Sequence, residues 1–339
     1  MAEGGGRRAY IGSFTTAGGR GILSAAVDPD SGALTVLDVL SGLPDPSYLA
    51  LSGDMLYAVS EAPDGAVAAY RLDGGRLEPS GPPVPVGRGP TYLSLHAGHL
   101  LTADYGSGSV TAVPLLAGGA LADSASGVLR HQGSGPVPQR QEGPHAHQVQ
   151  PDPSGRWVVS VDLGTDSVRV CALRDGTVRL HREIPMPAGS GPRHLAFHPD
   201  GNHAYVLNEL TPTVTVCRWD AGAGALRPVG QTSVLPDRPV GDAYPSGIVV
   251  SPDGRFVWTA TRGQDLLSVL AVEGAGLRPV AAVPCGGAWP RALALSEGFL
   301  YVANERSGNV TWFAPDRETG LPRRGGSVEA PAASCVVFG

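Results

Sequence analysis

The sequence predicts an all-β fold, a seven-bladed β-propeller whose last blade is closed by strands from both termini. Three observations lead to this prediction. The 339 residues include 48 glycines and 31 prolines, roughly twice the average usage, which indicates many tight turns between short strands. A unit of blade length recurs six times inside the chain, and the two ends carry complementary halves of a seventh unit.

Each internal unit opens on a proline that precedes a short apolar run. A turn such as S-P-D-G-R or H-P-D-G-N follows, then a second strand, a polar turn, a third strand and a looser run. Spacings of 44 to 54 residues between these prolines, with several antiparallel strands per unit, are typical of propeller blades. The opening prolines are Pro46, Pro90, Pro144, Pro192, Pro245 and Pro290.

The two ends of the chain complete the count of blades. Pro331 opens a single strand, P-A-A-S-C-V-V-F-G, and residues 9–28 match a second and a third strand that lack a first. Joined, they close the ring and remove the open sheet edges that favour aggregation. A β-sandwich or two stacked β domains would not need these matched halves. We therefore expect a single propeller over residues 9–339 and a disordered N-terminus at residues 1–8.

Composition limits the classes of function. The net charge of −6 argues against a nucleic-acid surface. No apolar run reaches the length of about 18 residues that a membrane span requires. All 25 cationic side chains are arginine. This excludes a lysine Schiff base and leaves the planar guanidinium group as the fixed cation for binding an anion.

The cysteines and the N-terminus indicate the compartment. No apolar signal segment precedes the first expected strand, and the four cysteines are scattered without a C-x-x-C pair. Free thiols in a reducing compartment are the simplest interpretation, so we expect a cytoplasmic protein. We also expect a monomer or weak dimer that binds a small anionic substrate and uses no cofactor.

The blade geometry predicts a polar mouth at one end of the central channel. In each hairpin the residue entering the first strand and the residue leaving the second lie at the same end. Crowded charges are costly there unless they are paired or used. We therefore favour a ligand site walled by ion pairs over a salt-bridged ring that only ties the blades together. The expected mouth residues are Ser47, Thr91, His145, Arg193, Ser246 and Arg291 on the first strands and Glu61, Asp104, Asp162, Glu209, Arg262 and Glu305 on the second.

Two further features lie near the expected mouth. His145 and His147 form an H-x-H pair on one face of a strand, but no third and fourth ligands are evident, so we expect no metal. The Gly- and Ser-rich segment 133–143 is either a plain surface loop or a loop over the mouth with Arg140 reaching in. A G-x-S-x-G elbow is absent, so a serine nucleophile is not supported.

Polar residues in the recurring turns are interpreted as structural. His198 occupies the place of Ser251 in the S-P-D-G turn and of Pro151 in Q-P-D-P, and is expected to be a turn residue. The aspartates of these three turns are Asp152, Asp200 and Asp253.

Several motifs resemble those of the seven-bladed lactonase family. They are YIGSFT near the start, RQEGPHAHQ, DLGTD, GPRHLAFHPDG, LNEL, SPDGRFVW and the closing VANERSGNVTWF, and they cover residues 9 to 338. That family includes propeller-type 6-phosphogluconolactonases and fungal carboxy-muconate cyclising enzymes.

The resemblance implies catalytic roles for His145 of the P-H-x-H motif, Arg193 of G-P-R-H and Glu209 of N-E-L. The family's activities need no metal. Its later S-N-R-G-like element appears here as T-A-T-R-G, which keeps Arg262 but lacks the asparagine. The shape of this part of the pocket is therefore expected to differ.

The expected reaction is hydrolysis of a small anionic sugar lactone of the 6-phosphogluconolactone type. Glu209 or His145 would deprotonate the attacking water, and Arg193 with Arg262 or Arg291 would stabilise the oxyanion. A remaining arginine would hold the substrate's phosphate or carboxylate. The further residues expected to bind substrate are Arg140, His147, Asp162, His194 and Glu305.

Three alternatives remain open from the sequence. A cyclising or ring-opening isomerase of an unsaturated acid would use the same groups, with one moving a proton and one holding the carboxylate. A pathway-specific tailoring enzyme would keep the fold with another substrate. A non-catalytic propeller that binds other proteins would have an inert mouth and broad patches on the blade rims.

Overall fold

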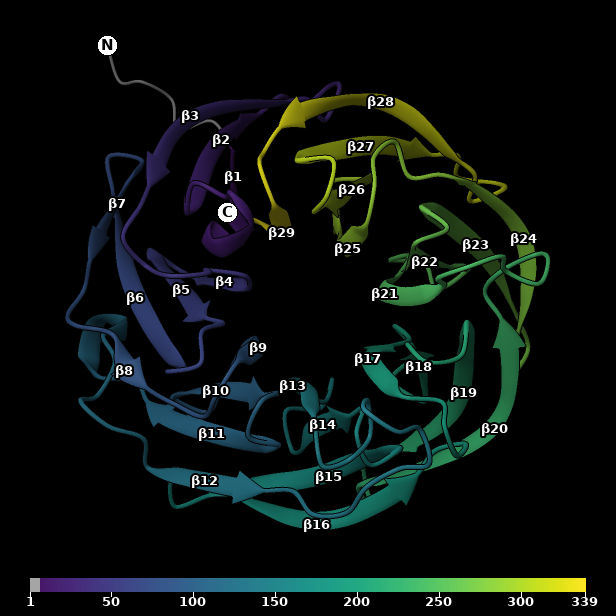
Figure 1. The fold of residues 1–339 in the computed structure, drawn as a ribbon, viewed down its shortest axis with the longest axis horizontal. Coiled ribbons are helices and arrows are strands. Elements are labelled where there is room, and N and C mark those ends of the chain that lie inside the picture. Colours follow the sequence, from purple (N-terminus) through teal and green to yellow (C-terminus); the bar gives the residue numbers. More distant parts are fainter. Residues whose placement is uncertain (1–6) are drawn as a thin grey trace.

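The computed structural model describes residues 7–339, which form seven β-sheets arranged radially around a central axis (Figure 1). The first strand of each unit lies nearest the axis, and the following strands pair outward from it. The predicted seven-bladed propeller is confirmed. Across residues 7–339 we find no helix with the length and apolar character to cross a membrane.

Every sheet has four strands in sequence order, apart from the sheet shared by the termini and one short additional strand. From the axis outward, the sheet shared by the termini consists of β29 (Ala333–Phe338), β1 (Arg8–Ser13), β2 (Ile22–Val27) and β3 (Leu34–Leu40), and the next sheet of β4 (Leu49–Ser52), β5 (Met55–Ser60), β6 (Ala66–Asp73) and β7 (Arg76–Pro79), with the short β8 (Val84–Pro85) paired to β6. The following two sheets are β9 (Pro90–His96), β10 (His99–Asp104), β11 (Ser109–Pro114) and β12 (Gly127–Arg130), then β13 (Ala146–Pro151), β14 (Val158–Asp162), β15 (Ser167–Arg174) and β16 (Thr177–Pro185). The last three are β17 (Pro192–Phe197), β18 (His203–Asn208), β19 (Thr213–Asp220) and β20 (Ala225–Ser233); β21 (Tyr244–Val250), β22 (Phe256–Arg262), β23 (Leu266–Glu273) and β24 (Gly276–Pro284); and β25 (Pro290–Ser296), β26 (Phe299–Asn304), β27 (Asn309–Pro315) and β28 (Pro322–Glu329). Two 3₁₀ turns, η1 (Thr15–Ala17) and η2 (Ala117–Gly119), follow β1 and β11.

The ring closes as the sequence predicts. β29 from the C-terminus pairs antiparallel with β1 from the N-terminus, with Tyr10 opposite Val337 (Figure 1). Closure leaves no inner strand without a partner. β1 begins at Arg8, the last residue of the segment predicted to be disordered. The rest of that prediction falls mainly on residues 1–6, which lie outside the described part of the chain.

Buried apolar side chains fill the spaces between neighbouring sheets. Val161 of β14 and Val170 of β15, for example, share one buried cluster with Val206 of β18 and Trp219 of β19 in the next sheet. Similar clusters recur around the ring. Each fully buried valine or leucine contributes about 1.5–3 kcal/mol. The fold is therefore held by apolar packing between blades, and polar residues near the axis are free to serve another purpose.

A β-bulge marks the start of the inner strand in six of the sheets. At each bulge the inner strand has one more residue than the second strand with which it pairs. Such a bulge changes the direction in which a side chain points. The Thr91 hydroxyl donates a hydrogen bond to the carbonyl of His147 on the next blade, and the Arg193 guanidinium donates one to the carbonyl of Ser246. These side chains therefore bridge the inner strands around the axis. The bulge residues are Thr91, His147, Arg193, Ser246, Arg291 and Ser334.

Candidate active site at the channel mouth

The bulges correct the predicted alignment of one blade. His147, rather than His145, is structurally equivalent to Arg193, because Ala146 pairs with Asp162 as Pro192 pairs with Asn208. His145 lies in the segment that leads into β13. The residue equivalent to Pro192 is therefore Ala146, two residues after the predicted Pro144.

The cause of this error is the position of Pro144. It lies eight residues before Asp152, whereas Pro192 and Pro245 each lie six residues before the equivalent turn residue. Asp152 takes the place of Ser251: its carboxylate accepts the N–H of Trp157, as the Ser251 hydroxyl accepts the N–H of Phe256. The P-S-G sequence at 153–155 then corresponds to P-D-G at 252–254. Counting backward from this glycine turn, instead of forward from Pro144, would have aligned His147 correctly.

A second correction concerns the residues that leave the second strands. Asp104 and Asp162 pair with the residue before the bulge, as Asn208 and Asn304 do in other sheets. The charged mouth residue Glu209 follows Asn208, and Glu305 follows Asn304. The predicted mouth positions Asp104 and Asp162 are therefore one residue too early, and a one-residue shift changes the direction of a strand side chain.

Asp162 is buried behind the mouth, where it has a full set of partners within the protein. Its carboxylate contacts His131 Nδ1 at 2.6 Å and Arg169 Nη1 at 3.2 Å, and accepts the N–H of His145 at 3.0 Å. Burial alone would raise its pKa, but the hydrogen bond and charge of His131, with help from Arg169, hold that pKa below its ordinary value. The structure therefore gives Asp162 the role of positioning the His145 backbone and does not support the predicted contact with substrate.

Asp104 occupies the same position with no cationic partner. Its carboxylate accepts the hydroxyls of Thr102, Ser109 and Thr111. Burial raises its pKa to about 6 despite these hydrogen bonds. Because the folded-state pKa lies above the ordinary value, ionised Asp104 costs folding free energy at pH values above about 6, and this cost disappears below about pH 4.

Asparagine substitutions at these two positions should therefore change stability in opposite directions. Asp104→Asn should raise the free energy of unfolding by about 1–3 kcal/mol at pH 8 and leave it unchanged at pH 4. Asn208 already serves at this position, where its amide donates to the hydroxyls of Thr213 and Thr215. Asp162→Asn should lower the free energy of unfolding by about 3–5 kcal/mol, because the buried charge that contacts both His131 and Arg169 would be lost. Urea unfolding at both pH values measures these changes, and a loss of stability in both variants would contradict the assignment.

Glu209 is the centre of the mouth. Its buried carboxylate contacts Arg140, Arg193 and Arg262, with Oε2 lying 3.0 Å from Arg193 Nε and 2.7 Å from Arg262 Nη2. Burial would raise its pKa, but the charges of Arg262, Arg193 and Arg140 outweigh that effect and lower the pKa to about 2. Glu209 therefore remains a carboxylate at any physiological pH.

Arg193 projects from its bulge into the most buried part of this cluster. Only 2% of its surface is exposed. Burial, reinforced by the charges of Arg262 and Arg291, lowers its pKa to about 9, although Glu209 opposes this change. The close contacts of Arg193 Nε and Arg262 Nη2 with Glu209 lack hydrogen-bond alignment, so these two N–H groups have no aligned acceptor. A second acceptor, such as an oxygen atom of a ligand, would satisfy them.

Aromatic rings contact the arginines along the rim of the mouth. The guanidinium carbons of Arg140 and Arg262 lie 5.7 and 5.9 Å from the centre of the Tyr244 ring. Those of Arg262 and Arg306 lie 5.6 and 3.3 Å from the Trp289 side chain's ring centre. Cation–π contacts hold guanidinium groups in place without neutralising their charge. This stack therefore keeps a line of cations available to an anionic ligand.

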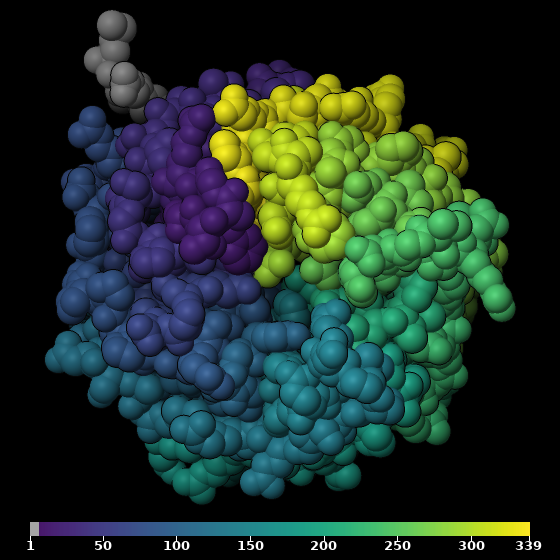
Figure 2. All heavy atoms as spheres, viewed as in Figure 1, coloured from purple at the N-terminus to yellow at the C-terminus, as the bar shows by residue number. Residues whose placement is uncertain are grey.

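The segment 133–143 delivers Arg140 to this stack. Gln141 is fully buried and anchors the segment through hydrogen bonds from its amide to the Leu163 carbonyl and the Asp166 carboxylate. Figure 2 shows this blue-teal segment on the viewer's face, beside the centre of the disc. The interpretation as a loop over the mouth, with Arg140 reaching in, is therefore the one that the structure supports over a plain surface loop.

Arg291 forms a second ion-pair group at the mouth, in the blade next to that of Arg262. It lies 3.3 Å from Glu61 and 3.4 Å from Glu305, and its guanidinium carbon is 4.4 Å from the centre of the Phe14 ring. Burial raises the pKa of Glu61, although Arg291 and the Ser47 hydroxyl act against this rise. The predicted residues Arg291 and Glu305 therefore do lie at the mouth, where Arg291 pairs with Glu61 and Glu305 rather than with Glu209.

His145 has one ring nitrogen fixed and the other more open. Its Nδ1 lies 3.0 Å from the carbonyl of Tyr105, which can only accept, so Nδ1 carries the proton and Nε2 carries the lone pair. The imidazole stacks on the Tyr105 ring at 4.3 Å, and Nε2 lies 3.7 Å from Glu142. Tyr105 also contacts the guanidinium of Arg140. His145 is thereby held in the tautomer that accepts a proton at Nε2.

His147 and His194 lie deeper, side by side. Their rings meet edge to face at 5.1 Å, and both are more than nine-tenths buried. Burial, followed by the charge of Arg193, holds the pKa of each well below its ordinary value. Both are therefore neutral, and His147 Nδ1 has no hydrogen-bond partner.

Below this layer the channel opens into a cavity of 590 Å³ on the other side of the disc. The first ring of its wall has one residue from each blade. Bulky polar side chains line one half and small residues line the other, so the space is lopsided. The ring consists of Tyr48, Tyr92, Gln148, His194, Gly247, Ala292 and Cys335.

A family model described as a seven-bladed β-propeller lactonase matches residues 8–338. The chain belongs to this family. It is 36% identical to the 6-phosphogluconolactonase of Bacillus subtilis, with 97% of each chain covered. Other similar sequences, such as one from Lactococcus lactis at 29% identity over 96% of this chain and 98% of the relative, are uncharacterised.

Solved structures of similar proteins agree with the fold. The periplasmic gluconolactonase of Pseudomonas aeruginosa has a TM-score of 0.90 at 31% identity, with 98% of each chain covered. A putative 6-phosphogluconolactonase from Bacteroides fragilis has a TM-score of 0.91 at 27% identity, over 100% of this chain and 99% of that one. The resemblance expected from the motifs is therefore confirmed, and lactonase activity is shown for the family rather than for this chain.

In this lactonase propeller the two histidines of the H-x-H pair have different surroundings. The Nδ1 of His145 is engaged with the Tyr105 carbonyl, and His147 stacks against Tyr105 and His194. Within residues 7–339, one group brings three metal-ligating side chains within 4.8 Å of one another, and it contains neither of these histidines.

Sequence reasoning missed the aromatic part of the lactonase mouth. Tyr244 and Trp289 each directly precede a blade-opening proline, and Tyr105 directly follows the end of a second strand. These positions lie next to those from which the mouth residues were predicted. An aromatic residue beside a blade proline, in a chain with arginines at the neighbouring positions, is the signal that would have found them.

Proposed function

We propose that the protein hydrolyses the ring ester of a small anionic sugar lactone of the 6-phosphogluconolactone type. The observation that carries this proposal is the convergence of Arg140, Arg193 and Arg262 on the carboxylate of Glu209. Arg140 also contacts Tyr105, on whose ring His145 stacks. The similarity to the 6-phosphogluconolactonase of Bacillus subtilis supports the choice of substrate class.

The attacking water is activated by His145 in this proposal. The neutral ring accepts a proton at Nε2 while the Tyr105 carbonyl retains the Nδ1 proton, so the ring becomes a cation beside Glu142. Glu209 was the other candidate base. With a pKa of about 2, its carboxylate is too weakly basic to take a proton from water efficiently near neutral pH. Glu209 instead holds the arginines in place.

Arg193 and Arg262 stabilise the oxyanion of the tetrahedral intermediate. Their N–H groups without aligned acceptors lie in a buried, low-dielectric site, where a developing negative charge gains most from fixed cations. The more exposed Arg140 then holds the phosphate or carboxylate of the substrate.

A comparison of substrates tests the proposed reaction. The purified protein should hydrolyse 6-phosphogluconolactone with a kcat/KM at least 10-fold above that for a muconate-type lactone. A reverse preference, with cyclisation of the unsaturated acid, would identify an isomerase instead. Failure to turn over either compound would contradict catalysis of both kinds and favour a binding protein.

Arg140→Ala should raise KM by about 10-fold or more and change kcat less. One charge-assisted hydrogen bond to an anion contributes about 1.5–3 kcal/mol, and the proposal places this bond in both ground and transition states. Steady-state kinetics measure the two constants. Arg71→Ala, which removes an exposed ion pair with Asp54 far from the mouth, is the matched control. A fall in kcat with KM unchanged would place Arg140 in the chemical step.

We also propose a cytoplasmic location. All four cysteines are buried and free, which agrees with a reducing compartment. Cell fractionation with an antibody against the chain tests this location.

A further inference from the structure

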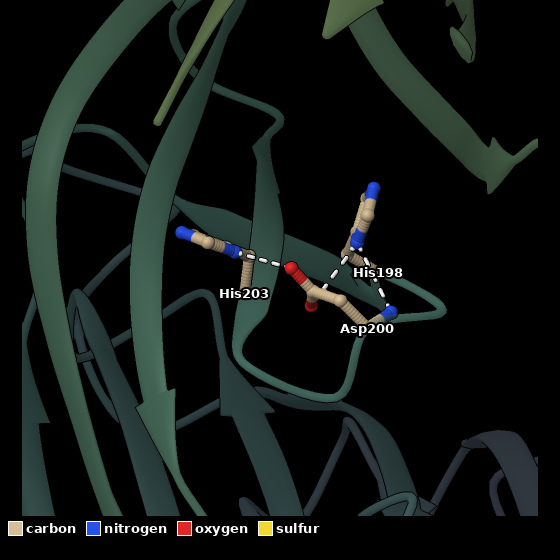
Figure 3. Close-up of side chains that lie close together, drawn as sticks. All are labelled: His198, Asp200 and His203. Carbon is tan, nitrogen blue, oxygen red and sulfur yellow. Dashed lines mark hydrogen bonds and ion pairs between the residues drawn. The ribbon is translucent and has the colours of Figure 1, made fainter. Parts of the chain in front are cut away.

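A cluster of two imidazoles and a carboxylate lies in the turn between β17 and β18. His198 Nδ1 is 3.0 Å from one oxygen of Asp200, and His203 Nδ1 is 2.9 Å from the other (Figure 3). The ligating atoms of all three side chains lie within 4.8 Å of one another. Because this turn joins the far end of β17 from the Arg193 bulge, the cluster lies away from the mouth.

The neighbouring blade has the same turn without the imidazoles. The N–H of His198 donates to the His203 carbonyl at 2.9 Å, and the N–H of Ser251 donates to the Phe256 carbonyl at 2.8 Å. In that sister turn the Ser251 hydroxyl and the Arg255 guanidinium hold the carboxylate of Asp253. The backbone therefore needs a small hydroxyl and an apolar residue at these two positions. Histidine at both goes beyond what the turn requires.

The protonation of His198 places two hydrogen-bond acceptors opposite each other in its contact with Asp200. Its Nε2 lies 3.0 Å from the Gly254 carbonyl, so Nε2 carries the proton and Nδ1 carries the lone pair in the neutral ring. That lone pair accepts the backbone N–H of Asp200 at 3.1 Å, but it also faces a carboxylate oxygen at 3.0 Å. Two acceptors at this distance repel each other unless a proton or a metal cation lies between them.

The Gly254 contact resembles the support that metal-binding histidines require. A histidine ligand usually donates its other N–H to a backbone carbonyl, which fixes the ring and its tautomer. The approach is close: a Cβ at Gly254 would lie 2.3 Å from His198 Nε2, and this residue has a φ of +74°. The ring is therefore held from behind with its coordinating nitrogen directed at Asp200.

We propose that His198, Asp200 and His203 bind a divalent transition metal of the Zn²⁺ type. Two imidazole nitrogens and one carboxylate oxygen suit such an ion, whereas Mg²⁺ and Ca²⁺ prefer oxygen ligands. The ion would replace the weak N–H contact at His198 Nδ1 and screen the repulsion there. His198 also lines the 590 Å³ cavity, so the ion would lie at its edge.

Zn²⁺ titration calorimetry on the full chain, after removal of metals with a chelator, tests this proposal. The wild-type protein should bind one Zn²⁺ per chain, and Mg²⁺ should give no signal. The double variant His198→Ser/His203→Phe converts the turn into its sister in the next blade and should lose this binding event. Asp200→Asn, which keeps the size of the side chain, should weaken Zn²⁺ binding by at least 10-fold.

His145→Ala controls for binding at the mouth and should keep the wild-type affinity for Zn²⁺. No binding by the wild-type protein would overturn the proposal, as would equal binding by the wild-type protein and the double variant. Loss of binding in His145→Ala alone would also overturn it and would place the ion at the mouth. If the double variant has a lower Tm than the wild-type protein in chelator, damage to the fold could explain its loss of Zn²⁺ binding. In that case the comparison of Asp200→Asn with the wild-type protein decides whether the ion binds at this turn.

Discussion

His145→Asn should lower kcat for lactone hydrolysis by about 10²–10⁴-fold, the range typical for loss of a general base. The asparagine amide can still donate to the Tyr105 carbonyl, as His145 Nδ1 does at 3.0 Å, so the local backbone is expected to keep its shape. What the variant lacks is the lone pair at Nε2. Stopped-flow or pH-stat assays of the substrate that the wild-type protein turns over would measure the change.

Two matched variants separate the role of His145 from its surroundings. Glu142→Gln removes an exposed carboxylate 3.7 Å from Nε2 and should change kcat by less than about 10-fold, because an exposed ion pair contributes little. His147→Asn alters the neighbouring histidine of the same motif. A large loss of kcat in His147→Asn with near wild-type activity in His145→Asn would assign the base to the bulge residue instead.

The seven-bladed fold was predictable because its signals are local and repeated. The S-P-D-G and H-P-D-G turns fix where hairpins fold back, and the unmatched strand after Pro331 requires a partner that only the N-terminus offers. Apolar packing between sheets then needs only residues of suitable size. No single long-range contact had to be known in advance.

The mouth was predictable in part, for a related reason. Arg193, Glu209 and Arg262 converge as expected, because their blades follow the common spacing. The alignment failed where the local pattern changes. Pro144 lies two residues further from the turn after β13 than the equivalent prolines do in other blades, which displaced His147 by two residues. Asp162 was counted one residue too early at the end of β14.

The partners within the mouth could not be predicted from spacing. Arg140 comes from a long connecting segment that has no counterpart in the other repeats. Which carboxylate each arginine reaches depends on distances between blades. The low pKa of Glu209 follows from that arrangement and not from its N-E-L motif.

Glu209→Gln should lower the free energy of unfolding by about 3–5 kcal/mol at pH 7, the usual cost of removing one member of a buried ion pair. Arg193 and Arg262 would remain buried and would face each other without the carboxylate between them. The pKa of Arg193 is already lowered to about 9 and should fall further. Urea unfolding gives the stability, and lactonase activity should fall with the loss of arginine placement.

The dependence on pH distinguishes this charge effect from loss of packing. The folded-state pKa of Glu209, about 2, lies below the ordinary value of 4.5, so its contribution of about 3 kcal/mol is fully present above about pH 4.5 and is lost as the pH falls towards 2. The difference between wild-type protein and Glu209→Gln should therefore shrink on acidification. A difference that stays constant down to pH 3 would mean that shape, and not charge, is what Glu209 supplies.

The double variant Glu209→Gln/Arg193→Met tests whether Glu209 serves mainly to balance the charge of Arg193. If the carboxylate serves mainly to balance the buried guanidinium, removal of both should cost less stability than Glu209→Gln alone, since a buried ion pair can be replaced by apolar groups at little cost. Activity should not return, because the oxyanion would have lost Arg193. Recovery of stability without recovery of activity would show that the charges at the mouth are maintained for the ligand at the expense of the fold.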